Sequence, residues 1–185
     1  MEIVAHALWA TAAGKVANRR IAKVGIVWFA IWTLLPDLFA FSPQVIVGLW
    51  YRFTGSAESH GLDFHHVGAR WGWLNLNLYD IGHSLVIFVS VFLIVSAILR
   101  RPLWEMLGWA LHILFDIPSH SAHYPTPFLW PLSSYYIVGV SWRQWWFMAL
   151  NCGTLAILFL AIWIDHIRRH GAPPTKVSRL AEVSE

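Results

Sequence analysis

The stretch that decides the fold is residues 144–164, QWWFMALNCGTLAILFLAIWI, an apolar run without a charged residue. Its length matches the roughly 20 residues that an α-helix needs to cross a bilayer. Three more apolar runs lie at 24–41 (continuing through Pro43 to Trp50), 83–99 and 102–117. Open sheet edges cannot be satisfied in lipid, so strands are excluded. We therefore predict an all-α polytopic membrane bundle with four long transmembrane helices and a short N-terminal helix at 2–14.

The composition supports a membrane protein. Hydrophobic residues make up 57% of the 185 residues and charged residues only 12%, against about 25% charged in a soluble domain. The chain has 13 Trp, a residue that favours membrane–water interfaces. The net charge of +3 does not indicate nucleic-acid binding, because Lys and Arg gather at the ends of apolar runs. Membrane lipid is the expected partner, and the oligomeric state is left open.

The basic residues predict which way the chain crosses the membrane. Ten of the 13 lie before the first run, between the second and third runs, or after the fourth. By the positive-inside rule these flanks are cytoplasmic, and the loops 51–82 and 118–143 face outward. We expect residues 1–170 to form a multi-pass domain in the inner (cytoplasmic) membrane. The polar, Pro-containing segment 171–185 is then a disordered cytoplasmic tail, while the orientation of the N-terminus stays open.

Ionisable residues within membrane spans are costly and are functional-site candidates by default. Asp37, His83 and Asp116 each lie roughly 21–25 Å from a basic flank, at about 1.5 Å of rise per residue. Their side chains are thus expected in the outer half of the membrane. His6 lies in the short N-terminal segment, nine residues before Lys15.

The strongest local pattern is His112-Ile-Leu-Phe-Asp116, an i, i+4 pair that shares one helix face. Such a pair can bind one cation, or two cations bridged by the carboxylate. Pro118 ends the helix, and His120 and His123 follow in the loop. Imidazole and carboxylate ligands without thiolate favour zinc or another divalent first-row metal.

Each candidate also has an ordinary structural explanation. His6 can be an interfacial residue with one hydrogen bond, and His83, next to Ser84, can be a helix cap. Asp37 can cap a helix break after Pro36. A simple hydrogen bond can account for the 112/116 pair.

The chain resembles the inner-membrane-associated metal-dependent hydrolases of bacteria. The similar segments are AHALWA with His6, LPDLFAF with Asp37 and YDIGHSLV with His83. The last is HILFDIPSHSAHYPTPFLWPLS with His112, Asp116 and His120. That family is distantly similar to zinc-dependent phospholipase C, an α-helical fold with His and Asp ligands on several helices. The resemblance implies hydrolase activity.

We therefore predict a membrane-bound, zinc-type hydrolase with one or two metal ions. It would act on an ester or phosphoester, including lipid-linked ones, through a metal-activated water. Asp37, His83 and Asp116 are the catalytic candidates. The predicted ligands are His6, Asp37, His83, His112, Asp116 and His120. Asp80 and His123 are predicted to orient a ligand or relay a proton.

Two other functions remain open. The chain could be a non-catalytic membrane subunit, or an ion- or proton-pathway protein, with a structural His/Asp cluster. It could also bind haem through His83 and His112 as axial ligands. The neighbouring carboxylates argue against haem, which needs none.

Overall fold

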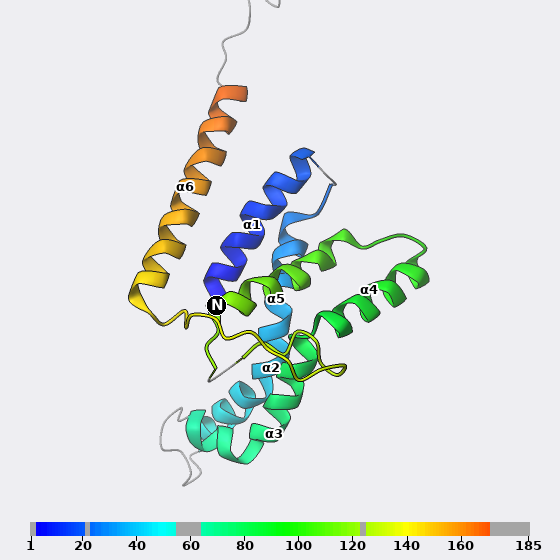
Figure 1. Ribbon diagram of the computed structural model, residues 1–185, viewed down its shortest axis with the longest axis vertical. Coiled ribbons are helices and arrows are strands. Elements are labelled where there is room, and N and C mark those ends of the chain that lie inside the picture. The colour runs from blue at the N-terminus through cyan, green and yellow to red at the C-terminus, as the bar shows by residue number, and fades with distance from the viewer. Residues whose placement is uncertain (1–2, 21–22, 55–63, 123–124, 171–185) are drawn as a thin grey trace, which may run out of the picture.

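The structure, a computed structural model, describes residues 3–20, 23–54, 64–122 and 125–170. Every regular element in these ranges is a helix, which confirms the all-α prediction for them. The tail 171–185 and His123 lie outside the described residues. The elements, shown in Figure 1, are α1 (Ile3–Arg20), α2 (Ile26–Thr54), α3 (Phe64–Gly82), α4 (Leu85–Leu99), the 3₁₀ turn η1 (Trp104–Met106), α5 (Leu107–Ser119) and α6 (Trp145–His170).

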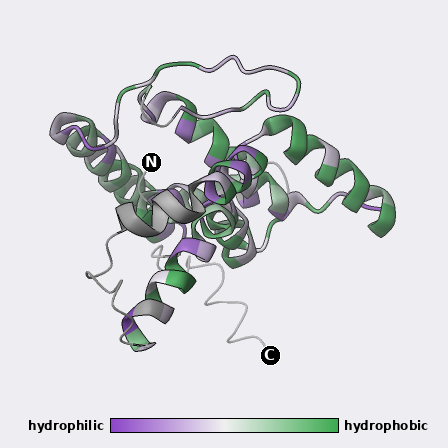
Figure 2. Cartoon of the chain, turned by 90° about the horizontal axis from the view of Figure 1, so that it is seen from below, coloured by the Kyte–Doolittle hydropathy of each residue, from purple (hydrophilic) through white to green (hydrophobic). Residues whose placement is uncertain are grey.

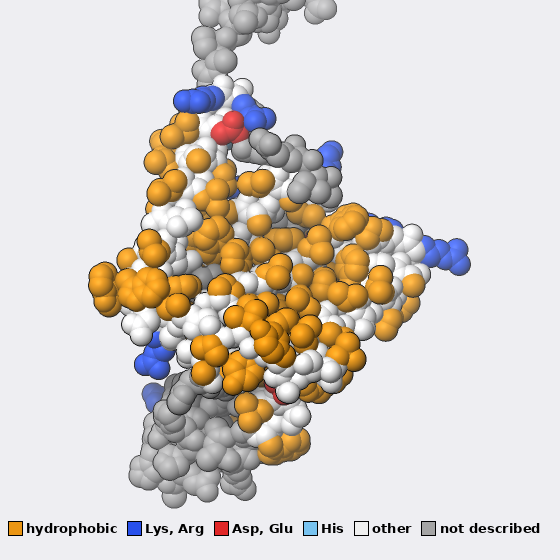
Figure 3. Space-filling model, in the orientation of Figure 1, with side chains coloured by type: hydrophobic (Ala, Val, Ile, Leu, Met, Phe, Trp, Pro, Cys, Tyr) orange, Lys and Arg blue, Asp and Glu red, His pale blue; other side chains and the backbone are white. Residues whose placement is uncertain are grey.

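Two of these helices are long and apolar enough to cross a membrane, α2 and α6. A third candidate is a bent pair, Trp73–Gly82 with α4, whose axes differ by 61°. Figure 2 shows hydrophobic residues along most turns of the helices, and in Figure 3 they cover much of the visible face. Large apolar side chains are widely exposed, such as Val27 at 71% and Ile157 at 70%. Such a surface is typical of contact with lipid.

The predicted count of four long spans differs from the two or three that the described helices provide. Run 102–117 forms η1 and α5, and α5 has only 13 residues. At 1.5 Å per residue it is about 20 Å long, shorter than the roughly 30 Å hydrocarbon core. The predicted outer loop 51–82 is also wrong in part, because α2 continues to Thr54 and 64–82 is helical. The predicted N-terminal helix continues through Lys15 to Arg20.

Helices α2 and α5 make an unusually close contact at Gly108. A Cβ there would overlap the carbonyl oxygen of Phe29 and lie 2.6 Å from Thr33 Oγ1. Asp37 lies one helical turn after Thr33 on α2, and His112 lies one turn after Gly108 on α5. The absence of a side chain at position 108 therefore lets these two residues face each other.

Residues 125–144 form neither helix nor strand. They lie against the break between α3 and α4 and against the end of α5. Leu85 N donates to Phe128 O at 2.9 Å. Gly139 N donates to His120 O at 2.8 Å, and Trp142 N donates to Ser119 O at 3.0 Å. These backbone hydrogen bonds fix the two helix ends that carry His83 and His120.

Candidate metal centre

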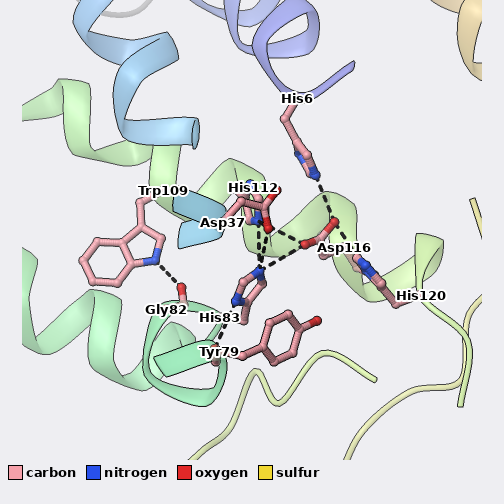
Figure 4. Close-up of polar contacts among 9 residues, drawn as sticks. All are labelled: His6, Asp37, Tyr79, Gly82, His83, Trp109, His112, Asp116 and His120. Atoms are coloured by element: carbon pink, nitrogen blue, oxygen red, sulfur yellow. Dashed lines mark hydrogen bonds and ion pairs between the residues drawn. The ribbon is translucent and has the colours of Figure 1, made fainter. Parts of the chain in front are cut away.

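Four acidic and imidazole side chains from three parts of the chain converge in the middle of the molecule (Figure 4). Asp37 comes from the middle of α2, directly after a proline inside that helix. His83 occupies the break between α3 and α4. His112 and Asp116 lie one turn apart on α5. These four residues could hold a metal ion, since one ligand atom from each lies within 4.8 Å of all the others.

The separations of the four ligand atoms match a tetrahedral site. His83 Nε2 is 3.1 Å from His112 Nε2, 3.5 Å from Asp37 Oδ1 and 3.4 Å from Asp116 Oδ2. His112 Nε2 is 3.7 Å from Asp37 Oδ1 and 3.0 Å from Asp116 Oδ2. A tetrahedron with metal–ligand bonds of 2.0–2.1 Å has edges of about 3.3–3.4 Å. These five edges are thus within a few tenths of an ångström of that value, and the ligand atoms of Asp37 and Asp116, which define the sixth edge, lie within 4.8 Å of each other.

His83 is oriented by the backbone of the preceding helical turn. Its Nδ1 lies 3.0 Å from the carbonyl oxygen of Tyr79, which can only accept, so Nδ1 carries the proton. The neutral ring then directs the lone pair of Nε2 into the cluster. The Tyr79 ring stacks on the imidazole, with centroids 3.9 Å apart. A histidine whose second nitrogen donates to a backbone carbonyl is a common arrangement for a metal ligand.

Three further hydrogen bonds hold the segment that carries His83. Trp109 Nε1 donates to the carbonyl oxygen of Gly82 at 2.6 Å. Ser84 caps α4, accepting from Ile87 N at 3.1 Å, and its hydroxyl also donates to Trp130 O. The position of His83 is therefore determined from both sides of the helix break.

The Asp116 carboxylate contacts histidines with both of its oxygens. Oδ2 faces His83 and His112, as described above. Oδ1 lies 3.0 Å from His6 Nε2 and 3.4 Å from His120 Nδ1. The His6 ring stacks on that of His112 with centroids 4.0 Å apart, so α1 closes one side of the cluster.

The cluster is almost completely shielded from solvent. The side chains of His6, His83 and His112 are 0% exposed, and Asp116 is 1% exposed. Asp37 and His120 retain 11% and 14% exposure and mark the open edge of the cluster. Burial lowers the pKa of His120, which favours its neutral form. The ion pairs described for the two carboxylates are all with histidines. A divalent cation would balance the two buried negative charges.

The structure brings together the six residues predicted as ligands, but in two groups. Asp37, His83, His112 and Asp116 surround one point, while His6 and His120 contact the other oxygen of Asp116. Asp80, on α3, makes no hydrogen bond or ion pair with the cluster among the described residues.

The orienting groups that the sequence did not reveal are Tyr79 and Trp109. Tyr79 acts through its backbone carbonyl, an acceptor that every residue has, so its identity carried no signal. Trp109 precedes His112 by three residues, but one Trp among 13 does not stand out.

No family model matches the chain, and neither the curated proteins nor the solved structures include a significant match.

Proposed function

We propose that this protein is a membrane-bound, metal-dependent hydrolase that acts on an ester or phosphoester with a metal-activated water. The observation that carries the proposal is the near-tetrahedral set of Asp37 Oδ1, His83 Nε2, His112 Nε2 and Asp116 Oδ2. The resemblance of the sequence blocks around His6, Asp37, His83 and His112 to bacterial inner-membrane metal-dependent hydrolases supports the reaction class.

Zinc is the metal that fits this donor set best. Two neutral imidazoles and two carboxylates at tetrahedral spacing suit Zn²⁺, whereas Mg²⁺ and Ca²⁺ prefer six or more oxygens. When bound, the metal supplies a Lewis acid and a more acidic water molecule. In the one-ion arrangement, His6 and His120 hold Asp116 through its other oxygen. If two ions were bound, the two oxygens of Asp116 would each face one of them, one beside His83 and His112 and the other beside His6 and His120.

The roles of the residues follow from their positions. His83 and His112 are fully buried and act as fixed ligands. A group that receives a proton from water must be reachable from the substrate side. A catalytic zinc site keeps a position for water beside its protein ligands, and the partly exposed members of the cluster, Asp37 and His120, would flank that position. We assign the proton-accepting role to whichever of these two is not bound to the metal.

A lipid-linked substrate agrees with the surroundings of the site. The cluster lies in a bundle with many exposed large apolar side chains, and α2, which carries Asp37, is itself a candidate span. Such side chains cover much of the face shown in Figure 3. We further propose an inner-membrane location with the end of α6 in the cytoplasm and the site toward the outer side. In Figure 1 the beginning of α2 and the end of α6 lie toward the same end of the molecule, which supports a common side for these two basic flanks.

Activity on a substrate panel tests this function. Protein reconstituted with zinc is assayed on fluorogenic carboxylic esters, phosphomonoesters and phosphodiesters, each with and without a long alkyl chain. We expect a chelator to abolish turnover and added zinc to restore it. Turnover should fall at least about 100-fold in Asp37→Asn and stay at the wild-type level in Asp165→Asn. Asp165 is a suitable control because it pairs with Arg169 on α6, away from the cluster. Turnover unaffected by the chelator, or a zinc-loaded protein inactive on every class, would contradict the proposal.

A second candidate is a non-catalytic subunit in which the cluster ties helices together. One observation favours it: His112 Nδ1 is buried without a hydrogen-bond partner in the described part of the chain. A proton on Nε2, shared with Asp116, would then satisfy the imidazole without a metal. Metal content separates the two candidates.

The haem alternative disagrees with the geometry. Axial ligands lie on opposite faces of one iron, roughly 4 Å apart at about 2 Å per bond, with the porphyrin between them. The Nε2 atoms of His83 and His112 are only 3.1 Å apart.

A further inference from the structure

A cavity lies beside α1, at the opposite end of that helix from the metal centre. It has a volume of about 640 Å³ and is lined by Lys15, Ile26, Phe159, Ile162, Trp163 and His166, among others. We call it the α1–α6 cleft. Its volume falls within the roughly 300–1,000 Å³ of typical small-molecule sites. It is independent of the metal cluster, because Lys15 is nine residues, or about 13 Å, along α1 from His6.

The cleft arises because α6 is hydrogen-bonded to α1 near the start of both helices. Trp9 Nε1 on α1 donates to Asn151 Oδ1 on α6 at 2.8 Å. Toward the end of α6 the walls are the side chains of α1, the first turn of α2 and α6. Figure 1 shows α6 running beside α1 to this end of the molecule.

Lys15 gives the cleft a positive charge. Its side chain is half-buried, and its Nζ lies 6.0 Å from the centre of the Phe159 ring. Within the described residues it has no carboxylate partner. Asp165, which lies on α6 between the lining residues Trp163 and His166, is paired with Arg169 at 3.0 Å. A partly buried ammonium group without a counter-ion favours an anionic ligand.

The remaining walls suit a hydrocarbon chain. Ile162 is buried, Phe159 is half-buried, and Trp163 is exposed at the mouth of the cleft. Lys and Arg side chains gather at this end of the molecule in Figure 3, at the depth where α6 ends in Arg168 and Arg169. Basic pockets between membrane helices at this level are typical sites for anionic lipid headgroups.

We propose that the α1–α6 cleft binds an anionic phospholipid from the adjacent leaflet. Lys15 contacts the headgroup phosphate, and one acyl chain lies along Phe159, Ile162 and Trp163. This site is separate from the proposed hydrolytic centre and does not depend on it.

Lipid binding by native mass spectrometry tests the proposal. Detergent-purified full-length protein is titrated with phosphatidylglycerol or phosphatidylcholine of equal chain length. We expect one preferentially retained phosphatidylglycerol in the wild type. Lys15→Gln removes the charge and should weaken this binding about fivefold, as expected for one basic residue near a lipid surface. Ile162→Trp, which fills the apolar part of the cleft, should weaken both lipids.

Arg101→Gln is the matched control, because Arg101 is an exposed basic residue between α4 and η1, away from the cleft. It should bind phosphatidylglycerol like the wild type. A Tm within a few degrees of the wild type shows that Lys15→Gln and Ile162→Trp are folded, and this readout does not depend on whether the protein binds metal or is a hydrolase. Equal retention of both lipids, or unchanged lipid binding by both cleft variants, would overturn the lipid site. Displacement of the lipid by inorganic phosphate alone would also overturn it. So would a change of oligomeric state in Lys15→Gln, which would indicate that a protein helix occupies the cleft.

Discussion

The Nε2 atoms of His83 and His112 lie 3.1 Å apart, although His83 comes from the break between α3 and α4 and His112 from within α5. Both nitrogens cannot donate to each other, and His83 already carries its proton on Nδ1. The Nε2 lone pair of His83, the Nε2 atom of His112 that faces it, and the oxygens of Asp37 and Asp116 make an environment suited to a cation. The candidate metal centre depends on that relationship.

Loss of the Asp37 carboxylate should weaken metal binding. Asp37→Asn replaces a charged ligand by a neutral amide, and even groups that only orient ligands change metal affinity about 10–100-fold. We expect at least a tenfold rise in the zinc dissociation constant, measured by competition with a chromogenic chelator. The control Asp165→Asn should bind zinc normally. Equal zinc affinity in Asp37→Asn and the wild type would remove Asp37 from the site.

The cap at Ser84 should matter for both stability and metal binding. Ser84→Ala removes the hydroxyl that accepts from Ile87 N, a loss of about 1 kcal/mol for a typical N-cap. It also frees the segment that carries His83, so zinc affinity should fall together with the Tm. Ser90→Ala is the control, because Ser90 is exposed on the same helix and its hydroxyl only donates to Val86 O. Similar thermal shifts in both variants would show that Ser84 has no special role.

The close contact at Gly108 predicts a strong effect of adding one methyl group. Gly108→Ala forces α5 away from Phe29 and Thr33, at a cost of about 1–3 kcal/mol, and moves His112 away from Asp37. Both the Tm and the bound zinc should decrease.

Gly153→Ala is the matched control, since a Cβ at that position of α6 has no atom within 4 Å. It should stabilise the protein slightly, by up to about 1 kcal/mol, because alanine favours a helix more than glycine does. A tolerated Gly108→Ala would show that α2 and α5 are further apart than described.

Acidification should release the metal. Imidazole binds a metal only in its neutral form, and its ordinary pKa is about 6.5. Bound zinc should therefore be retained at pH 7.5 and lost progressively below about pH 6, as protons compete for His83 and His112. Zinc content after dialysis at a series of pH values measures this. Retention down to pH 4 would indicate ligands other than these histidines.

Part of the cluster could be predicted from the sequence because helical spacing is a local property. The i, i+4 relation of His112 and Asp116 required only that 107–119 be helical, and their 3.0 Å contact follows. Asp37 and His83 were placed at a similar depth by counting residues from basic flanks. That count cannot show whether side chains from different helices point toward each other. The Gly108 contact determines this, and it is visible only in three dimensions.

The lengths of the helices were harder to predict than their presence. Residues 64–82 mix Trp, Asn and Gly, so no continuous apolar run marked α3 as a helix. Run 102–117 looked long enough to cross a membrane, but its first residues form an irregular start and a 3₁₀ turn before α5 begins. Hydropathy measures how apolar a segment is, and a helix enclosed by its neighbours is as apolar as one that faces lipid.

The most direct test of the central claim is the molar ratio of metal to protein, measured by elemental analysis of protein purified without chelator. The wild type and the control His166→Ala, altered on exposed α6, should each carry at least one zinc per chain. His112→Ala should carry less than about a tenth of that amount, because it removes one of the four converging ligands. A wild-type protein without stoichiometric metal, or a His112→Ala variant with the same metal content, would contradict the metal centre.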